Sequence, residues 1–139
     1  MGTKVIEVSA GLIFRSGRLL ITQRLADAHL GGLWEFPGGK RESGETFAQC
    51  LARELREELG IEVNVGELFE RVTHAYDDKT VCLQFFLCEL LSTREPQPLE
   101  CAALKWVSRE ELVAHPFPAA DAQLVSRLVA DLARWQLAA

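Results

Sequence analysis

Positive charge is scarce in this chain of 139 residues. Its 15 Lys and Arg residues are outnumbered by 20 Asp and Glu residues, which gives a formal net charge of -5. Proteins that hold DNA or RNA without regard to sequence do so through basic surfaces that contact the phosphates. This charge balance therefore argues against a stable polynucleotide partner. It remains compatible with a small anionic substrate that arrives with a metal ion.

The sequence also lacks a signal peptide, a lipidation motif, an internal repeat and any apolar run long enough to cross a membrane. These absences predict a cytoplasmic protein without membrane attachment. The four cysteines show neither CxxC spacing nor a zinc-type arrangement with the three histidines. We therefore expect reduced thiols at Cys50, Cys82, Cys88 and Cys101.

Hydrophobic residues make up 48% of the chain and charged residues 25%, which is typical of a globular protein. A chain of this length suits one compact core, so we expect a single domain over residues 3–137. The sequence leaves open whether that domain is a monomer or a dimer.

Strand patterns dominate the chain outside one central helix. Apolar residues alternate with others over residues 6–14, and the Arg-Ser-Gly-Arg sequence at 15–18 is typical of a hairpin turn. Further strands are expected at residues 19–22, 34–36, 62–73, 80–91 and 104–107, and a short helix at 109–113 capped by Ser108. A last helix is expected after Asp121 as its N-cap, with Leu124, Leu128, Leu132 and Trp135 on its apolar side. The pattern predicts an α/β fold of the α+β type, a mixed β-sheet sandwiched between α-helices.

The central helix is predicted at residues 45–59, a segment without Gly or Pro. Ser43 or Gly44 is the expected N-cap, and Gly60 stands where a left-handed C-terminal residue belongs. At 3.6 residues per turn, one apolar stripe contains Phe47, Ala48, Leu51, Ala52, Leu55 and Leu59. Beside that stripe the same geometry places three carboxylates on one face, those of Glu54, Glu57 and Glu58.

Carboxylates stacked on one helix face repel one another, and a bound divalent cation would turn this repulsion into attraction. Ligand sets made only of oxygen favour hard ions, so Mg²⁺ is the expected cofactor and Mn²⁺ a possible substitute. Arg53 lies four residues before Glu57 and is placed to orient its carboxylate. A solvated helix face with Glu–Arg pairs is the alternative when this segment is considered alone.

The frame around these carboxylates is more specific than the carboxylates themselves. Gly39 is followed after five residues by Glu45, and after seven more by the run Arg-Glu-Leu-Arg-Glu-Glu-Leu-Gly-Ile at 53–61. Residues 39–61 thus resemble a complete Nudix box, with every specified position filled. The resemblance implies the Nudix fold and a metal-dependent hydrolase that acts on a nucleoside diphosphate linked to another group.

The resemblance extends beyond the box and covers most of the chain. Residues 20–40, with Leu-Trp-Glu-Phe-Pro-Gly-Gly-Lys at their end, are similar to the MutT branch of the family, the 8-oxo-dGTP diphosphatases that clean the nucleotide pool. For the metal, the resemblance implies the carbonyl of Gly38 and the side chains of Glu54, Glu57, Glu58 and Glu100, with Arg53 as support for the glutamates. For the nucleotide, it implies Arg24, Phe36, Lys40, Phe117 and Asp121.

The implied reaction converts a nucleoside triphosphate into a monophosphate and pyrophosphate. Metal ions would bridge phosphate oxygens and align a water molecule for in-line attack. A carboxylate must take the proton of that water. Glu54 is the first candidate for this base and Glu100 the second.

Asp121 departs from the MutT pattern, which has an amide side chain at this position. An amide donates and accepts hydrogen bonds, whereas an ionised carboxylate only accepts them. Asp121 could therefore accept from the amino group of cytosine, as the related CTP, dCTP and 5-methyl-dCTP pyrophosphohydrolases would require. It could also bind an oxidised guanine through the ring N–H and amino group of that base, or in its protonated form.

A function of another class is the non-catalytic, lesion-sensing domain that ends adenine glycosylases and also resembles MutT. Such domains usually have a degraded box, whereas all the metal-bearing glutamates are present in this chain. We therefore expect an enzyme with 8-oxo-dGTP as its preferred substrate, and cytosine nucleotides as the alternative.

Overall fold

The computed structural model of the chain describes residues 4–136, so the expected domain limits at 3 and 137 lie just outside the described residues. The strands are β1 (Lys4–Arg15), β2 (Arg18–Gln23), β3 (Trp34–Glu35), β4 (Gly38–Lys40), β5 (Val63–Ala75), β6 (Lys79–Leu90) and β7 (Ala103–Val107). The helices are α1 (Phe47–Leu59), α2 (Arg109–Leu112), α3 (Ala122–Ala130) and α4 (Leu132–Gln136), with a short 3₁₀ turn η1 (Ala119–Asp121) before α3.

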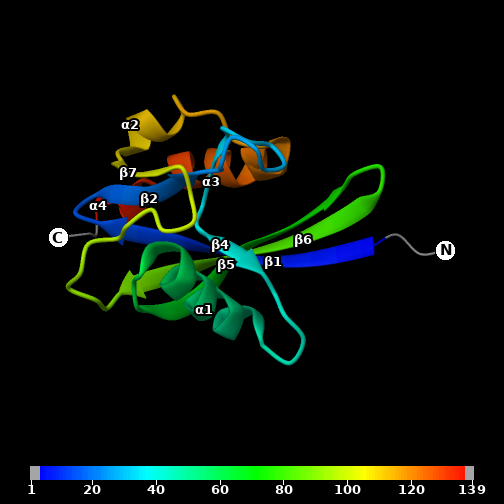
Figure 1. Cartoon of the computed structure of the whole chain (residues 1–139). Helices are drawn as coiled ribbons and strands as arrows, with labels where there is room; N and C mark the ends of the chain where they lie inside the picture. Colours follow the sequence, from blue (N-terminus) through cyan, green and yellow to red (C-terminus); the bar gives the residue numbers. More distant parts are fainter. Residues whose placement is uncertain (1–3, 137–139) are drawn as a thin grey trace.

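The sheet is mixed, with the strand order β3-β2-β1-β6-β5, and β4 and β7 pair with β1 and β2 from outside this path. Strand β1 runs parallel to β6, whereas the other pairs are antiparallel. Figure 1 shows α1 on one face of the sheet and α2 and α3 on the other. The predicted α+β architecture, a mixed sheet between helices, is confirmed. No helix within residues 4–136 is both long and apolar enough to cross a membrane.

The turn predicted at residues 15–18 joins β1 to β2. Ser16 and Gly17 both have positive φ angles, 52° and 75°. Two adjacent residues of this kind form the turns whose twist matches that of a two-stranded hairpin. The turn therefore sets the pairing of Arg15 with Arg18 and leads the chain into β2.

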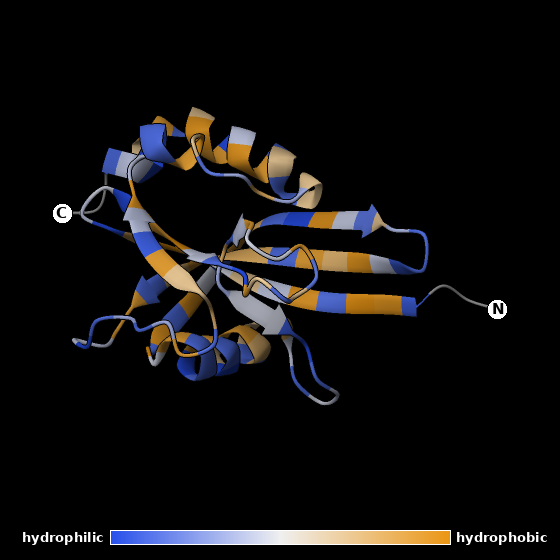
Figure 2. Cartoon of the chain, turned by 45° about the horizontal axis from the view of Figure 1, so that its top comes forward, coloured by the Kyte–Doolittle hydropathy of each residue, from blue (hydrophilic) through white to orange (hydrophobic). Residues whose placement is uncertain are grey.

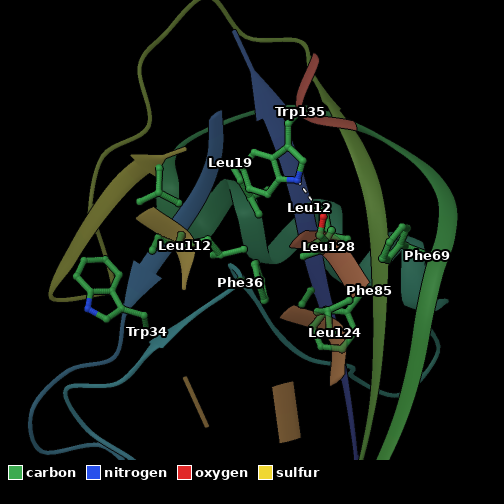
Figure 3. Packing of buried hydrophobic residues seen from close by; sticks show 13 residues of the cluster. Leu12, Leu19, Trp34, Phe36, Phe69, Phe85, Leu112, Leu124, Leu128 and Trp135 are labelled. Atoms are coloured by element: carbon green, nitrogen blue, oxygen red, sulfur yellow. Dashed lines mark hydrogen bonds between the residues drawn. The ribbon is translucent and has the colours of Figure 1, made fainter. Parts of the chain in front are cut away.

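Strand β1 separates two hydrophobic cores because its side chains alternate between the two faces of the sheet. Ala10 and Leu12 belong to the core beneath α2, α3 and α4, where Phe85 and Leu124 are also buried (Figure 3). Ile13 faces the other way, into the core beneath α1, which consists of Ile13, Leu20, Leu51, Leu55, Leu59 and Ile61. Figure 2 shows that polar and apolar residues are interspersed along the helices and strands. Each fully buried Leu or Phe side chain stabilises the fold by roughly 1.5–3 kcal/mol.

Helix α1 begins two residues later than predicted, and its N-cap is Thr46 instead of Ser43 or Gly44. The Thr46 hydroxyl accepts from the Gln49 N–H at 3.0 Å, and the Gln49 side chain accepts from the Thr46 N–H at 2.9 Å. This reciprocal capping box satisfies two backbone donors that the helix leaves unpaired. At the other end, Gly60 takes the predicted left-handed conformation, with φ 69°.

The last predicted helix is also revised. It is two helices, α3 and α4, which are separated at Asp131, and Leu132 is 50% exposed instead of lying on the apolar side. Asp121 occupies the N-cap position, but its side chain makes no capping hydrogen bond. It is buried, with 6% exposure, and lines a cleft. By contrast, Ser108 caps α2 as predicted.

Candidate metal and nucleotide site

One cleft of about 790 Å³ contains almost all the residues that the sequence singles out. Its lining includes Arg24, Phe36, Gly38, Lys40, Arg53, Glu54, Glu57, Glu58, Glu100 and Asp121. The carboxylates of α1 form one end, whereas Phe85, Ala120 and Asp121 belong to the other. Of the predicted site residues, Phe117 alone is not part of this lining.

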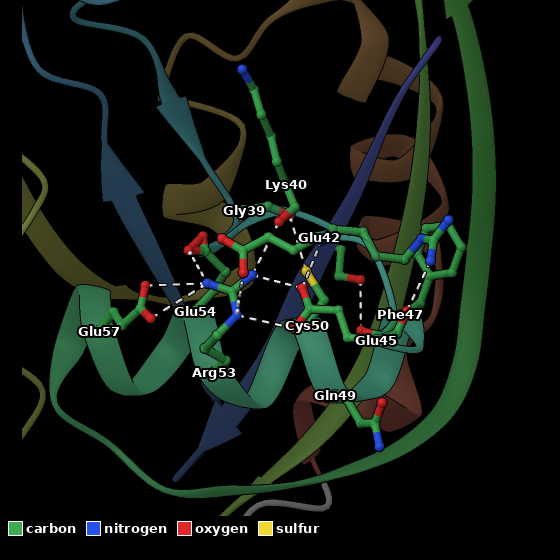
Figure 4. A network of polar contacts seen from close by, with 12 residues as sticks. Gly39, Lys40, Glu42, Glu45, Phe47, Gln49, Cys50, Arg53, Glu54 and Glu57 are labelled. Atoms are coloured by element: carbon green, nitrogen blue, oxygen red, sulfur yellow. Dashed lines mark hydrogen bonds and ion pairs between the residues drawn. The ribbon is translucent and has the colours of Figure 1, made fainter.

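Arg53 is the centre of the polar network at the carboxylate end (Figure 4). Its Nε and Nη2 atoms donate to the two carboxylate oxygens of Glu45 at 3.0 and 2.7 Å. Its Nη1 atom donates to Glu54 at 3.3 Å and to Glu57 at 3.2 Å, and Nη2 also reaches the Lys40 carbonyl at 3.2 Å. Arg53 therefore joins the helix, the preceding loop and β4.

Helical spacing predicts a contact of Arg53 with Glu57, and the family resemblance implies that Arg53 supports the glutamates as a group. The structure confirms the contact with Glu57 and adds the contact with Glu54. Three residues later, Arg56 turns away from the cleft and pairs with Glu62 at 2.7 Å, where both side chains are exposed. The two arginines of the box thus have different surroundings.

The glycines of β4 allow the carboxylates to lie against the backbone. A Cβ atom on Gly39 would overlap Oε2 of Glu54, and one on Gly38 would overlap the carbonyl oxygen of Ser9 in β1. No larger residue fits at either position unless the strand or the helix moves. The Gly-Gly pair therefore brings the β4 backbone directly beside Glu54.

Glu58 is the most deeply buried carboxylate of α1, and its Oε1 atom has no hydrogen-bond partner. Burial, followed by the nearby charges of Glu35, Glu54 and Glu100, raises the pKa of Glu58 to about 8. Burial also raises the pKa of Glu54. The protein thus keeps an unpaired oxygen of Glu58 away from solvent, which is unfavourable unless a positive group binds it.

These donors fit a hard divalent cation. The orphaned oxygen of Glu58 and the repulsion among neighbouring carboxylates both favour such an ion. Within residues 4–136, however, no three His, Cys, Asp or Glu side chains are grouped so as to hold a metal ion. Glu54 and Glu57 are hydrogen-bonded to Arg53.

Glu100 reaches this end of the cleft from a loop that docks on the C-terminus of α1. The N–H of Gln97 donates to the Leu59 carbonyl and the N–H of Leu99 to the Glu58 carbonyl, both at 3.0 Å. These carbonyls belong to the last helical turn, which has no partners within the helix. The loop thus places Glu100 near enough for its charge to raise the pKa values of Glu54 and Glu58.

Aromatic rings form the wall at the opposite end. Phe36 is 4% exposed, lines the cleft and packs edge-to-face on Phe85 with ring centroids 6.0 Å apart. Phe117 stacks on Phe36 at 5.2 Å, from outside the cleft lining. Phe117 thus contacts the cleft through Phe36, and its proposed contact with the nucleotide remains a prediction.

A partly buried carboxylate, Glu35, lies beside these rings, and the sequence pattern did not single it out. Glu35 accepts a hydrogen bond from Nη1 of Arg24 at 2.8 Å, and both side chains line the cleft. Burial and the charge of Glu35 raise the pKa of Asp121 to about 7. An acidic residue between two aromatic residues in a short strand was the signal that could have revealed Glu35.

Lys40 lines the cleft with an exposed side chain. Figure 4 shows this side chain extending away from the Arg53 network. The proposed contact of Lys40 with phosphate remains a prediction.

Comparison with known proteins agrees with this geometry. The family described as NUDIX domain matches residues 9–127, which include the whole carboxylate helix and its flanking strands. The chain belongs to the Nudix family. Enzymes of this family depend on divalent metal ions, which accords with the unpaired acidic oxygens of the cleft.

Two curated relatives of this Nudix chain cover nearly its full length. It is 40% identical to a CTP pyrophosphohydrolase of Escherichia coli over 91% of this chain and 93% of the relative. It is also 40% identical to an 8-oxo-dGTP diphosphatase of Haemophilus influenzae over 93% of this chain and 95% of the relative. The solution structure of the E. coli ORF135 protein superposes with a TM-score of 0.78 at 40% identity, covering 92% of this chain and 91% of that one. The relatives thus include proteins named for both substrates that the sequence left open.

Proposed function

We propose that this Nudix enzyme is a Mg²⁺-dependent nucleoside triphosphate pyrophosphohydrolase of the MutT type, which converts 8-oxo-dGTP into the monophosphate and pyrophosphate. The main observation in support of this proposal is that one cleft contains both a group of carboxylates and a pocket that suits a nucleobase. The carboxylates of α1 lie at one end, and a pocket with Phe36, Arg24 and Asp121 lies at the other. The relatives named 8-oxo-dGTP diphosphatase support it.

Mg²⁺, or Mn²⁺ in its place, would be held by the Gly38 carbonyl and by the carboxylates of Glu54, Glu57, Glu58 and Glu100. Such an ion neutralises phosphate charge and orients the attacking water. Arg53 keeps Glu54 and Glu57 facing the cleft through its Nη1 atom. The exposed ammonium group of Lys40 would contact a phosphate at the cleft mouth.

Glu54 remains our first candidate for the base that takes the proton of the attacking water, ahead of Glu100. Its pKa is raised by burial, so the Glu54 carboxylate holds a proton more readily than an exposed one does. Glu100 is exposed in the loop beside it.

The state of Asp121 favours the oxidised purine. With a pKa near 7, the buried carboxyl is about half protonated at neutral pH. A protonated carboxyl donates through O–H and accepts through C=O, as an amide does. In this form Asp121 can take the place of the amide of the MutT pattern in binding 8-oxoguanine, and the ionised form can still accept from the ring N–H and amino group of that base.

Hydrolysis of CTP, dCTP or 5-methyl-dCTP is the second candidate function. The ionised form of Asp121 is an acceptor suited to the amino group of cytosine. The 40% identity to a CTP pyrophosphohydrolase supports this alternative. A lesion-sensing module without catalysis is less well supported, because Glu54, Glu57 and Glu58 of the box all line the cleft.

We further propose that the enzyme works in the cytoplasm on free nucleotides, as a monomer or a dimer. The four free cysteines support a reducing compartment. The net charge of -5 supports a small substrate in preference to a polynucleotide.

The test is pyrophosphate release with Mg²⁺ from 8-oxo-dGTP, dGTP, CTP, dCTP, 5-methyl-dCTP, ADP-ribose and diadenosine tetraphosphate, with Glu57→Gln as the inactive control. We expect kcat/KM for 8-oxo-dGTP to exceed that for dGTP by at least about tenfold. Preference for cytosine nucleotides would establish the second candidate. A chain that binds nucleotides but releases no pyrophosphate would establish the binding module.

A further inference from the structure

Glu35 is an acidic side chain that no part of the proposed reaction uses. It lies on β3 between the buried rings of Trp34 and Phe36, and its side chain is 26% exposed. Its cross-strand partner in β2 is Thr22, a buried residue whose hydroxyl has no hydrogen-bond partner. A carboxylate in such surroundings is unfavourable unless it binds something, and burial accordingly raises the pKa of Glu35.

Arg24 is the partner of Glu35, and the same guanidinium holds a loop. Nη1 of Arg24 donates to Glu35 at 2.8 Å, and Nε donates to the His29 carbonyl at 2.6 Å. The Arg24 backbone closes the base of this loop through the Leu33 carbonyl at 2.9 Å and the Gly32 N–H at 3.2 Å. The enclosed residues Leu25, Ala28, His29 and Leu30 line the cleft. One ion pair therefore connects β3 to this wall of the cleft.

Two carboxylates other than that of Glu35 also lie close enough to interact with the positive charge of Arg24. Its positive charge acts on Glu58 at the metal end and on Asp121 at the base end. A guanidinium released from Glu35 would be drawn towards these two groups, since unpaired buried charges attract strongly. At Glu58 it would occupy the oxygen that suits a cation, and at Asp121 it would hold the carboxyl in the ionised form.

We propose that Glu35 is a positioning residue that holds Arg24 at the wall of the nucleobase pocket. The inference rests on the proposed function only in that the cleft receives a nucleotide base. Glu35 acts through Arg24 and contacts neither the phosphates nor the metal. Its contribution therefore belongs to binding of the base and to the shape of the loop.

The experiment measures binding of nucleoside monophosphates by calorimetry in EDTA, so that metal and hydrolysis play no part. The ligands are 8-oxo-dGMP, dGMP, CMP and dCMP. Glu35→Gln preserves the shape of the side chain and removes its charge, and we expect the best ligand to bind about tenfold more weakly. Glu35→Asp keeps the charge and should lose less affinity for the same ligand. Glu89→Gln, on the exposed side of β6, is the matched control.

A double variant of Arg24 and Glu35 distinguishes a positioning role of Glu35 from a general loss of structure. We expect the double variant Arg24→Gln/Glu35→Gln to bind no more weakly than Arg24→Gln alone, because the role of Glu35 passes through the guanidinium. With Mg²⁺ at saturation, Glu35→Gln should raise KM about tenfold and change kcat by less than about threefold. Melting temperatures identify any variant that fails to fold. If Glu35→Gln does not fold, Glu35→Asp is compared with wild type in its place.

Equal binding by Glu35→Gln and wild type would overturn the inference, and so would additive losses in the double variant. A failure of the proposed function looks different. In that case wild type would prefer another monophosphate or hydrolyse another triphosphate, while the coupling between Arg24 and Glu35 would still be measured with whichever ligand binds best.

Discussion

Arg53 donates two hydrogen bonds to the carboxylate of Glu45, which lies eight residues earlier and precedes the first turn of α1. These bonds hold the pKa of Glu45 at about 2, so its charge persists at any physiological pH. The pair fastens the loop after β4 onto the helix that carries the metal carboxylates. Glu45 therefore serves the site by holding Arg53, whose remaining N–H groups reach Glu54 and Glu57.

Arg53→Lys should lower kcat/KM for the preferred triphosphate by about 10-fold to 100-fold, as expected for a group that orients metal ligands. A lysine carries the charge but cannot make the paired bonds to Glu45 while also reaching Glu54 and Glu57. Pyrophosphate release over a range of Mg²⁺ concentrations measures the effect. Arg56→Lys is the control, because Arg56 pairs with Glu62 outside the cleft, and wild-type activity is expected of it. Equal losses in both variants would contradict the assignment.

Gly39→Ala should reduce activity about 100-fold or more, because the new Cβ would overlap Oε2 of Glu54 and displace that carboxylate. The overpacking should also lower the free energy of unfolding by about 1–3 kcal/mol. Turnover and urea denaturation measure the two effects. Gly44→Ala is the comparison: Gly44 also has a positive φ, 87°, but a Cβ there meets nothing within 4 Å. That variant should keep its activity despite some backbone strain.

Glu58→Gln should lower turnover by about 100-fold to 1,000-fold and yet stabilise the metal-free protein at pH 8 by about 2 kcal/mol. The raised pKa of Glu58, about 8, means that the folded state keeps a proton that the unfolded state releases above its usual value of 4.5. The metal-free wild type therefore loses stability as pH rises between these values, whereas the variant does not lose this contribution.

Melting temperatures in EDTA between pH 5 and pH 9 test this sign. Added Mg²⁺ should raise the melting temperature of wild type more than that of Glu58→Gln, since the ion binds the ionised carboxylate of the folded state. A variant that melts below wild type at pH 8 without metal would show that the unpaired oxygen of Glu58 has a partner in solution.

Asp121 should make the choice of base depend on pH. With a pKa of about 7, its protonated fraction falls from about 0.9 at pH 6 to about 0.1 at pH 8. The ratio of kcat/KM for 8-oxo-dGTP over that for CTP should fall about tenfold across this range, because only the protonated form donates. Asp121→Asn should hold the ratio nearly constant. A wild-type ratio that does not change with pH would indicate that Asp121 does not contact the base.

Interactions between residues that are close in the sequence were sufficient to predict many of the turns, caps and helices of the fold. The turn at Ser16 and Gly17, the left-handed Gly60 and the helix between 47 and 59 all follow from short-range geometry. The sequence by itself also determined the grouping of Glu54, Glu57 and Glu58, because helical periodicity places them on one face. The start of α1 was predictable in principle, since Thr46 and Gln49 form a capping box three residues apart.

Only the tertiary structure decided which charges share a buried space. The stacking of Phe117 on Phe36 and the burial of Asp121, which the sequence predicted as a helix cap, depend on contacts between residues that are distant in the sequence. The pairing of Glu35 with Arg24 arises from the contact between β2 and β3. Hydrogen bonding along a helix is local, whereas desolvation and Coulomb interactions depend on neighbours that are distant in the sequence, and these set the chemistry of the cleft.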